Sequence, residues 1–266
     1  MSIANFLVEP ELRGMDIESP KRIELHSKIL ARKKMMLEVF QMFYNICIKL
    51  DQQYLNDTPG LRIELGAGVS LFNKYYPDVK ITDIKPAEHL DAVIDAQKMD
   101  FEDSSIHSFF GLNFFHHLPD PNLFFQELLR VVYPGGGCVL IEPYYGPVAS
   151  FMYNKLFATE IFDKKEKSWN SVSRGAMIGA NQALLYNILI RDRAKFLTLY
   201  PDLEILKVMP IPNFMRYLIS GGLNFRQLCP NSFAWLVVLA EKILYPLKSI
   251  FALHYAVVLR KKCDSN

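Results

Sequence analysis

The chain has 266 residues, with 30 basic and 28 acidic side chains, 50% hydrophobic residues and 22% charged residues. This length and hydrophobic content are enough for a packed core, and they exclude a disordered or fibrous chain. A net charge of +2 excludes the strongly basic surface typical of nucleic-acid binding, so we expect no nucleic-acid partner.

The cysteines and the N-terminal residues indicate in which cellular compartment the protein is expected. Cys47, Cys138, Cys229 and Cys263 lie far apart and match neither a disulfide framework nor a zinc site. The first residues lack the pattern of a signal peptide, and no apolar run reaches the roughly 18 residues of a membrane span. We therefore expect a cytoplasmic protein, with membrane association as the alternative. The sequence does not indicate an oligomeric state.

The N-terminal region predicts an arm followed by helices. Residues 1–18 are mixed and polar, and Ser19-Pro20 is a typical helix start. One broken helix or two consecutive helices are expected over 20–54, because the apolar residues Met36, Phe40, Phe43, Cys47 and Leu50 follow a helical period. The basic residues over 21–34 predict a solvated face, and attraction to an anionic substrate or lipid surface is the alternative.

From residue 61 short apolar runs of strand length alternate with helical patterns. The helical patterns cover 71–76 and 121–132, and the expected strands cover 61–65, 79–82, 92–94, 106–112 and 138–141. This alternation predicts an α/β protein whose parallel sheet is covered by helices on both faces.

The regular alternation of strand and helix patterns ends at Pro147. Residues 148–200 predict mainly helix, and 203–209 and 254–259 predict two last strands. Between these strands, 211–253 predicts an inserted helical cap, whose apolar run 233–240 we expect to be buried on the protein rather than placed on lipid. Two short polar segments, 179–183 and 191–193, lie in apolar sequence, and we call them polar islands. They predict a helix start and a surface ion pair, with substrate recognition as the alternative.

The segment Glu64-Leu-Gly66-Ala67-Gly68 carries the strongest chemical signal. An apolar strand leads into two glycines and then a helical pattern, which lets the backbone approach a ligand closely. Asp83 and Asp95 end the next two strands. In a parallel sheet these positions meet at one edge, where Asp83 can bind the hydroxyls of a ribose and Asp95, with the Ala96 amide, an adenine.

These motifs, with 113–120, 127–136 and 139–143, resemble the class I S-adenosylmethionine (SAM)-dependent methyltransferases, type 11 branch. The resemblance covers roughly residues 60–145. It implies a doubly wound, Rossmann-like seven-stranded sheet and a methyltransferase with SAM as cofactor. It places the cofactor-binding residues at Glu64, Gly66, Ala67, Gly68, Asp83, Ile84, Asp95, Ala96 and Asn113. Two residues depart from the family pattern: Ser70 replaces a usual third glycine, and Tyr133 a common lysine.

The resemblance also implies an organisation for the rest of the chain. A single domain over 1–266 would comprise N-terminal helices over 1–58, a SAM-binding core over 59–147, substrate-cap regions over 148–253 and a last strand over 254–266. The acceptor would be a small molecule, a glycan or a lipid-linked compound, which the sequence does not identify.

His116 and His117 follow the fourth expected strand, near the transferred methyl group. One of them can serve as the general base for a hydroxyl acceptor, and a purely structural role for both is the equal alternative. Glu142, Tyr144 and Tyr145 are weaker candidates. We expect no metal, since no further Cys, His or acidic residue completes a ligand set in the sequence.

Two other functions fit parts of the pattern. A non-catalytic protein of the SAM-binding fold would keep the glycine loop without turnover. A dinucleotide-dependent oxidoreductase would share the loop and a following acid, but its third glycine is missing here.

Overall fold

A seven-stranded sheet forms the centre of the computed structural model, which describes residues 7–16, 19, 21–155, 160–171 and 180–263. The strands are β1 (Leu61–Leu65), β2 (Val79–Asp83), β3 (Ala92–Val93), β4 (Ile106–Leu112), β5 (Val132–Pro143), β6 (Leu203–Ile211) and β7 (His254–Lys261). Their order is β3-β2-β1-β4-β5-β7-β6. Strands β1 to β5 are parallel, and β7 runs antiparallel to β5 and β6. The predicted doubly wound sheet is confirmed.

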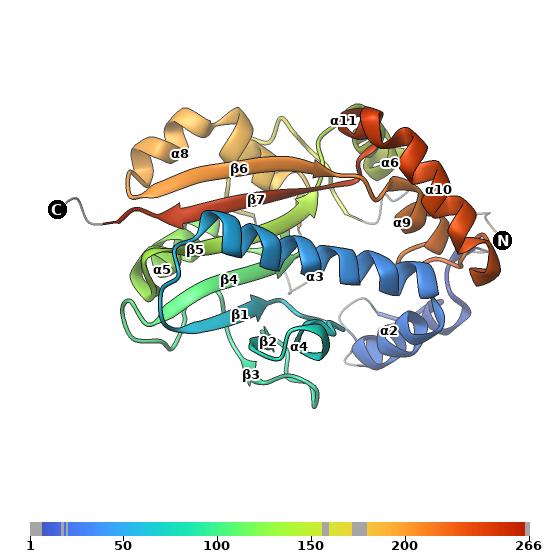
Figure 1. The fold of residues 1–266 in the computed structure, drawn as a ribbon, viewed down its shortest axis with the longest axis horizontal. Coiled ribbons are helices and arrows are strands. Elements are labelled where there is room, and N and C mark those ends of the chain that lie inside the picture. The colour runs from blue at the N-terminus through green and yellow to red at the C-terminus, as the bar shows by residue number, and fades with distance from the viewer. Residues whose placement is uncertain (1–6, 17–18, 20, 156–159, 172–179, 264–266) are drawn as a thin grey trace.

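Helices precede and connect these strands (Figure 1). The α-helices are α2 (Lys21–Arg32), α3 (Lys34–Tyr54), α4 (Phe72–Tyr75), α5 (Pro121–Val131), α6 (Pro147–Lys155), α7 (Leu184–Tyr186), α8 (Arg193–Leu199), α9 (Phe214–Ser220), α10 (Ala234–Leu244) and α11 (Lys248–Phe251). Single turns of 3-10 or π helix are η1 (Pro10–Leu12), η2 (Phe115–His117), η3 (Asn187–Arg191), η4 (Asn231–Phe233) and η5 (Tyr245–Leu247). The helical insertion predicted before the last strand is therefore present.

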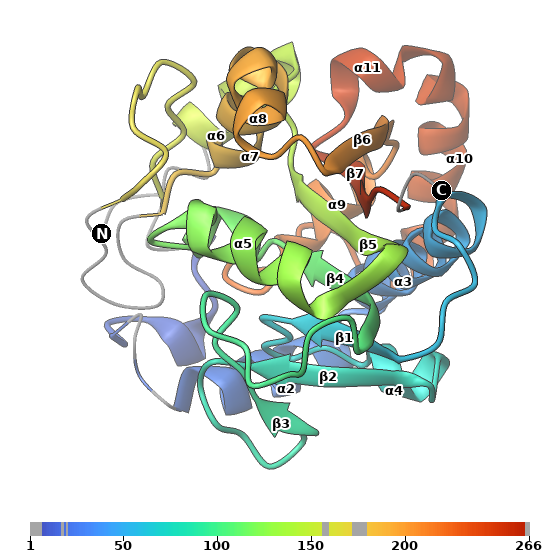
Figure 2. The same cartoon turned by 90° about the vertical axis from the view of Figure 1, so that its left-hand side faces the viewer.

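Each face of the sheet buries its own set of side chains. In β4, Phe109 packs with α5 and α8 on one face, whereas Phe110 packs with α3 and α4 on the other. Figure 2 shows α5 and α3 on opposite sides of the sheet. Because both faces are covered, strands such as β4 are buried along their whole length, which is why they appear in the sequence as continuous apolar runs.

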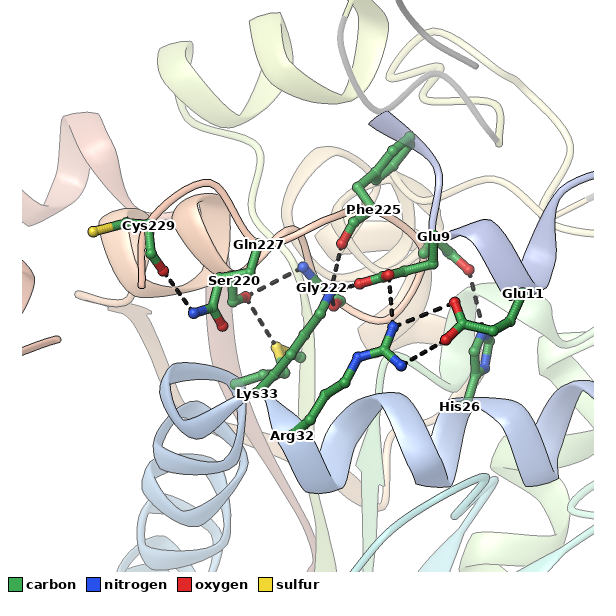
Figure 3. A network of polar contacts seen from close by, with 12 residues as sticks. Glu9, Glu11, His26, Arg32, Lys33, Ser220, Gly222, Phe225, Gln227 and Cys229 are labelled. Carbon is green, nitrogen blue, oxygen red and sulfur yellow. Dashed lines mark hydrogen bonds and ion pairs between the residues drawn. The ribbon is translucent and has the colours of Figure 1, made fainter. Parts of the chain in front are cut away.

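The predicted N-terminal helix is broken at Lys33. The backbone of Lys33 is not helical, and its side chain is only 2% exposed. The Lys33 ammonium pairs with Glu9 of the arm at 2.8 Å and donates hydrogen bonds to the carbonyl oxygens of Gly222 and Phe225 (Figure 3). The prediction of a solvated basic face is wrong for Lys33, because a buried cation needs such partners. Pro20 and part of the predicted arm lie outside the described residues.

Two expectations about the second half of the chain need correction. The stretch 148–200 is helical only in α6 and from α7 onward; the described residues 160–171 and 180–183 are not helical. The run 233–240 is not buried as a whole, because α10 turns only Ala234 and Val237 inward, onto Met35, while Trp235, at 63% exposed, faces outward. None of the described helices has the length and apolar character of a membrane span.

The core on the α5 face yields a stability prediction. Phe125 is fully buried, with its ring centroid 5.0 Å from that of Phe196 and 5.1 Å from that of Tyr200. Phe125→Ala should lower the free energy of unfolding by about 3–5 kcal/mol, because it removes this packing and leaves a cavity. Leu123→Ala, on the same helix but 42% exposed, should change it by less than about 0.5 kcal/mol. Chemical denaturation measures both, and equal losses would contradict the assignment of this core.

Candidate functional site

A cavity of about 560 Å³ lies at the carboxyl ends of the central parallel strands. Residues at the ends of β1, β2 and β4 line it, together with α2 and the segment that follows α9. All of the predicted site residues contribute to its wall: Glu64, Gly66, Ala67, Gly68, Asp83, Ile84, Asp95, Ala96, Asn113, His116 and His117. The structure thus brings the whole predicted set to one site.

The glycine loop is shaped by its backbone. Gly66 and Gly68 have φ angles of +65° and +53°, which side chains other than hydrogen disfavour. A Cβ on Gly66 would lie 2.5 Å from the Phe114 ring, whereas a Cβ on Gly68 would meet no atom within 4 Å. The lack of a side chain at Gly66 therefore makes room for the Phe114 ring. At Gly68 it leaves the backbone accessible from the cavity. The Asp83 carboxylate accepts a hydrogen bond from Gly68 N at 2.9 Å and fixes the loop to β2.

Glu64 is the most unusual acid of the loop. It is 1% exposed, its Oε2 has no hydrogen-bond partner, and burial raises its pKa to about 8. A hydrogen bond with Ser70 opposes this rise. Ser70 also contacts the Tyr44 hydroxyl at 3.0 Å and accepts from Phe72 N. The serine that replaces a third glycine thus belongs to a buried network around the loop.

Beyond the loop, the second and third acids lie on the cavity wall. Asp83 also accepts a hydrogen bond from Lys85 N at 3.0 Å, and Asp95 accepts one from Gln97 N at 2.9 Å. Ile84, next to Asp83, is 51% exposed. Two carboxylates beside an exposed apolar side chain suit a ligand that combines hydroxyl or amino groups with a flat ring.

His116 is held between two carboxylates. Its Nδ1 lies 2.5 Å from Glu142 Oε2, and its Nε2 lies 3.3 Å from Glu160 Oε2. Burial acts to lower the pKa of His116, but the charges and hydrogen bonds of Glu142 and Glu160 outweigh it and raise the pKa to about 10. His116 is therefore a cation at neutral pH and has no lone pair with which to accept a proton.

His117 has the opposite character. Burial, followed by the positive charge of His116, lowers its pKa to about 3, so the ring is neutral at physiological pH. The rings of His116 and His117 lie 4.2 Å apart, and His117 Nδ1 is buried without a hydrogen-bond partner. Of the two predicted histidines, only His117 is in a state to accept a proton.

Glu160 and Gln182 are site residues that the sequence did not indicate as such. Gln182 Nε2 donates to Glu160 Oε2 at 3.1 Å, and both line the cavity. Glu160 lies in no motif; Gln182 lies in the polar island at 179–183, for which substrate recognition was the lesser alternative. The ion pair predicted in the other island is confirmed between Arg191 and Asp192 at 2.7 Å.

The premise for expecting no metal is wrong, because Glu160 supplies the missing acid. Ligand atoms of His116, His117 and Glu160 lie within 4.8 Å of one another. We assign no metal to them, since a proton on each nitrogen of His116 satisfies both carboxylates. Of the weaker candidates, Glu142 supports His116 from outside the cavity wall, and Tyr144 and Tyr145 pack on Tyr255.

The far wall of the cavity comes from the insertion before β7. Tyr217 of α9 and residues 221–225 line it next to Arg22 and His26 of α2. Arg22 donates to Asn224 Oδ1 at 2.8 Å, and the Lys33 ammonium holds the carbonyls of the same segment (Figure 3). This wall is thus fixed to the N-terminal helices by buried polar contacts.

A family model described as a methyltransferase domain matches residues 64–140, the span from the glycine loop to the middle of β5. Residues 64–140 therefore match a methyltransferase domain, as the motifs of this segment predicted. No curated protein matches the chain.

Solved structures that resemble the whole chain share little sequence with it. Geranyl diphosphate C-methyltransferase from Streptomyces coelicolor, in complex with Mg²⁺, geranyl diphosphate and S-adenosyl-L-homocysteine, is 12% identical, with 96% of this chain and 89% of that chain covered and a TM-score of 0.46. Phosphoethanolamine N-methyltransferase 2 from Haemonchus contortus, in complex with SAM, is 11% identical, with 99% and 61% covered and a TM-score of 0.47.

The cavity of the methyltransferase domain fits SAM in two respects. The orphaned Oε2 of Glu64 offers a buried acceptor to an ammonium group, and the open backbone at Gly68 leaves space for a ligand chain. Two further acids, Asp83 and Asp95, face the same cavity and suit a ligand with a positively charged sulfur.

The raised pKa of Glu64 predicts a pH-dependent stability. Between its ordinary value of 4.5 and about 8, the folded protein keeps a proton that the unfolded chain releases, so this group makes stability fall as pH rises through that window. Glu64→Gln copies the protonated form. Its melting temperature should match that of the wild type near pH 5 and exceed it near pH 9. Thermal unfolding without ligand measures this, and a gap that does not grow with pH would refute the buried, protonated state.

Proposed function

We propose that the protein transfers the methyl group of SAM to a hydroxyl group of a small-molecule or glycan acceptor, free or carried on a lipid. One observation carries the proposal: in the cavity that the glycine loop also lines, the buried polar atoms His117 Nδ1 and Gln182 Oε1 have no hydrogen-bond partner among the described residues. Leaving a polar atom buried and unpaired costs about 1–3 kcal/mol, which a hydroxyl-bearing ligand would recover. Both residues line the cavity with Glu160.

We assign the cofactor-binding role to residues on the β1 and β2 side. Glu64 would face the amino group of SAM, Asp83 the ribose hydroxyls, and Asp95 with Ala96 the adenine, with Ile84 against the ring. When bound, SAM supplies an electrophilic methyl group on a positively charged sulfur. Gly66, Ala67, Gly68 and Asn113 would complete the contact surface, and Phe114 keeps Gly66 in place by close packing.

Proton removal falls to His117 in this proposal. An acceptor hydroxyl becomes strongly acidic once its oxygen gains a methyl group, so a base whose own pKa is low can take the proton as the new bond forms. His117 is neutral and has an unpaired ring nitrogen. His116, held as a cation by Glu142 and Glu160, is a positioning residue that orients Glu160 and adds to the effect of burial in lowering the pKa of His117.

Glu160 and Gln182 would orient the acceptor. Burial acts to raise the pKa of Glu160, but the hydrogen bond and charge of His116 lower it to about 2, so Glu160 is an anion that accepts hydrogen bonds. A carboxylate and an amide side by side are suited to neighbouring hydroxyl groups. A cytoplasmic location fits the four free cysteines of the described chain.

The cofactor assignment predicts the effect of removing Asp83. Asp83→Ala should weaken SAM binding by about 1.5–3 kcal/mol, because a charged acceptor for two hydroxyls is lost. Asp78→Ala, which removes an exposed acid outside the cavity, is the matched control and should bind SAM like the wild type. Titration calorimetry measures both. Unchanged affinity in Asp83→Ala would mean that the ribose is held by other residues.

The transfer itself can be tested with labelled SAM and extracts of the source cells. Wild-type protein should place the label in a glycan, lipid or small-molecule fraction. His117→Ala should lower the rate about a hundredfold while SAM affinity changes little. At saturating SAM, the wild-type rate should show no histidine inflection near pH 6.5, because the pKa values of His116 and His117 are about 10 and about 3. Full activity of His117→Ala would assign His117 a structural role, and no labelled product from any extract would contradict the proposed function.

A further inference from the structure

The outer face of the insertion before β7 is apolar and uncovered. Of the large hydrophobic side chains exposed in the described chain, nine of eighteen lie between residues 228 and 250. They are Leu228, Phe233, Trp235, Leu236, Leu239, Ile243, Tyr245, Leu247 and Ile250. In Figures 1 and 2, α10 and α11 form one outer corner of the molecule, on the side away from α5. We call this set the α10–α11 face.

The α10–α11 face results from how α10 packs. The buried residues of α10 are Ala234, Val237 and Glu241. The Glu241 carboxylate accepts a hydrogen bond from Arg216 Nε at 2.6 Å. The opposite side presents Trp235 at 63% and Ile243 at 71% exposed. A helix that is apolar on both sides needs a second apolar partner, and water is a poor one.

The exposed charges of the segment that forms this face are basic. Between residues 228 and 251 the only acid is Glu241, which is buried and paired with Arg216, whereas the basic residues are Lys242 and Lys248. Lys242 is exposed, and the Lys248 ammonium lies 3.2 Å from the Tyr245 hydroxyl. Helix α6, which contacts α11, adds an exposed Phe151 and Lys155 and has no acid.

We propose that the α10–α11 face docks the protein on the surface of an anionic lipid bilayer. Apolar side chains that include Trp235 and Tyr245, together with two lysines and no exposed acid in the same segment, have the composition of helices that lie in the bilayer interface. An anionic surface complements the lysines. Pairing of two copies through the same face would cover the apolar side chains but would offer Lys242 and Lys248 no exposed acid of the same segment as a partner.

The position of the face bears on the substrate. Helix α10 packs on α9, and the segment 221–225 that follows α9 is a wall of the cavity. The docked face and this wall of the cavity are therefore parts of one insertion. Within the proposed function, a face that docks on lipid favours a lipid-linked compound as the acceptor.

Vesicle flotation of the full chain tests the docking without any enzymatic step. The wild type should float with phosphatidylcholine vesicles that contain 30 mol% phosphatidylglycerol, and at least tenfold less with pure phosphatidylcholine. Trp235→Ser with Ile243→Ser, and separately Lys242→Gln with Lys248→Gln, should each lower the bound fraction at least tenfold. Leu197→Ser with Leu199→Ser, which removes two exposed leucines of α8, is the matched control and should float like the wild type.

Three outcomes would overturn the proposal. The wild type does not float with either vesicle, or the control variant loses binding as strongly as the α10 variant, or the wild type is a dimer that the α10 variant converts to monomers. An unchanged melting temperature and unchanged SAM binding establish that each variant is folded. Because flotation does not require methyl transfer, failure to float leaves the proposed function in place, and failure of transfer leaves the docking in place.

Discussion

A single buried carboxylate, that of Glu142, organises the reactive side of the cavity. Glu142 ends β5 and is 0% exposed. Its Oε1 accepts hydrogen bonds from the backbone amides of Phe114 and Phe115, and its Oε2 binds His116. The turn after β4 and the charge of His116 are thus fixed by one side chain of the neighbouring strand. Burial, followed by the charge of His116, lowers the pKa of His117, and the hydrogen bond and charge of His116 lower that of Glu160, so the contact of Glu142 with His116 contributes to the protonation states of both neighbours.

Hydrophobic periodicity and turn residues predicted most strands of the sheet and the N-terminal helices, and they placed the glycine loop and the two acids that follow it at one edge of the sheet. Strands buried on both faces produce apolar runs, and their carboxyl ends meet at one edge, so Glu64, Asp83 and Asp95 could be placed together from their positions alone. Such reasoning depends on regular elements. Glu160 reaches His116 from a segment without helix or strand at that point, and no local pattern encodes the path of that segment.

The insertion shows a second reason why prediction fails. Eight consecutive apolar residues in 233–240 favour burial when only composition is considered. A helix that is apolar around its whole circumference does not reveal which side meets the protein. The decision is made by small and polar residues: Ala234 lets α10 approach the cluster around Met35, and the ion pair of Glu241 with Arg216 fixes the rotation. Trp235 and Ile243 face outward as a consequence.

The antiparallel direction of β7 has a consequence for how the molecule can change. Ile211, the last residue of β6, pairs directly with His254, the first of β7, and Asn213 contacts His254 at 2.9 Å. The chain therefore leaves and re-enters the sheet at one point, and everything between forms an excursion with joined ends. Lengthening such a loop costs only about 0.6 kcal/mol per doubling. The excursion carries one wall of the cavity and the α10–α11 face, whereas the glycine loop lies in the other half of the sheet. An exchange of the excursion between related chains would change that wall and the outer face and leave the pairing of the strands intact.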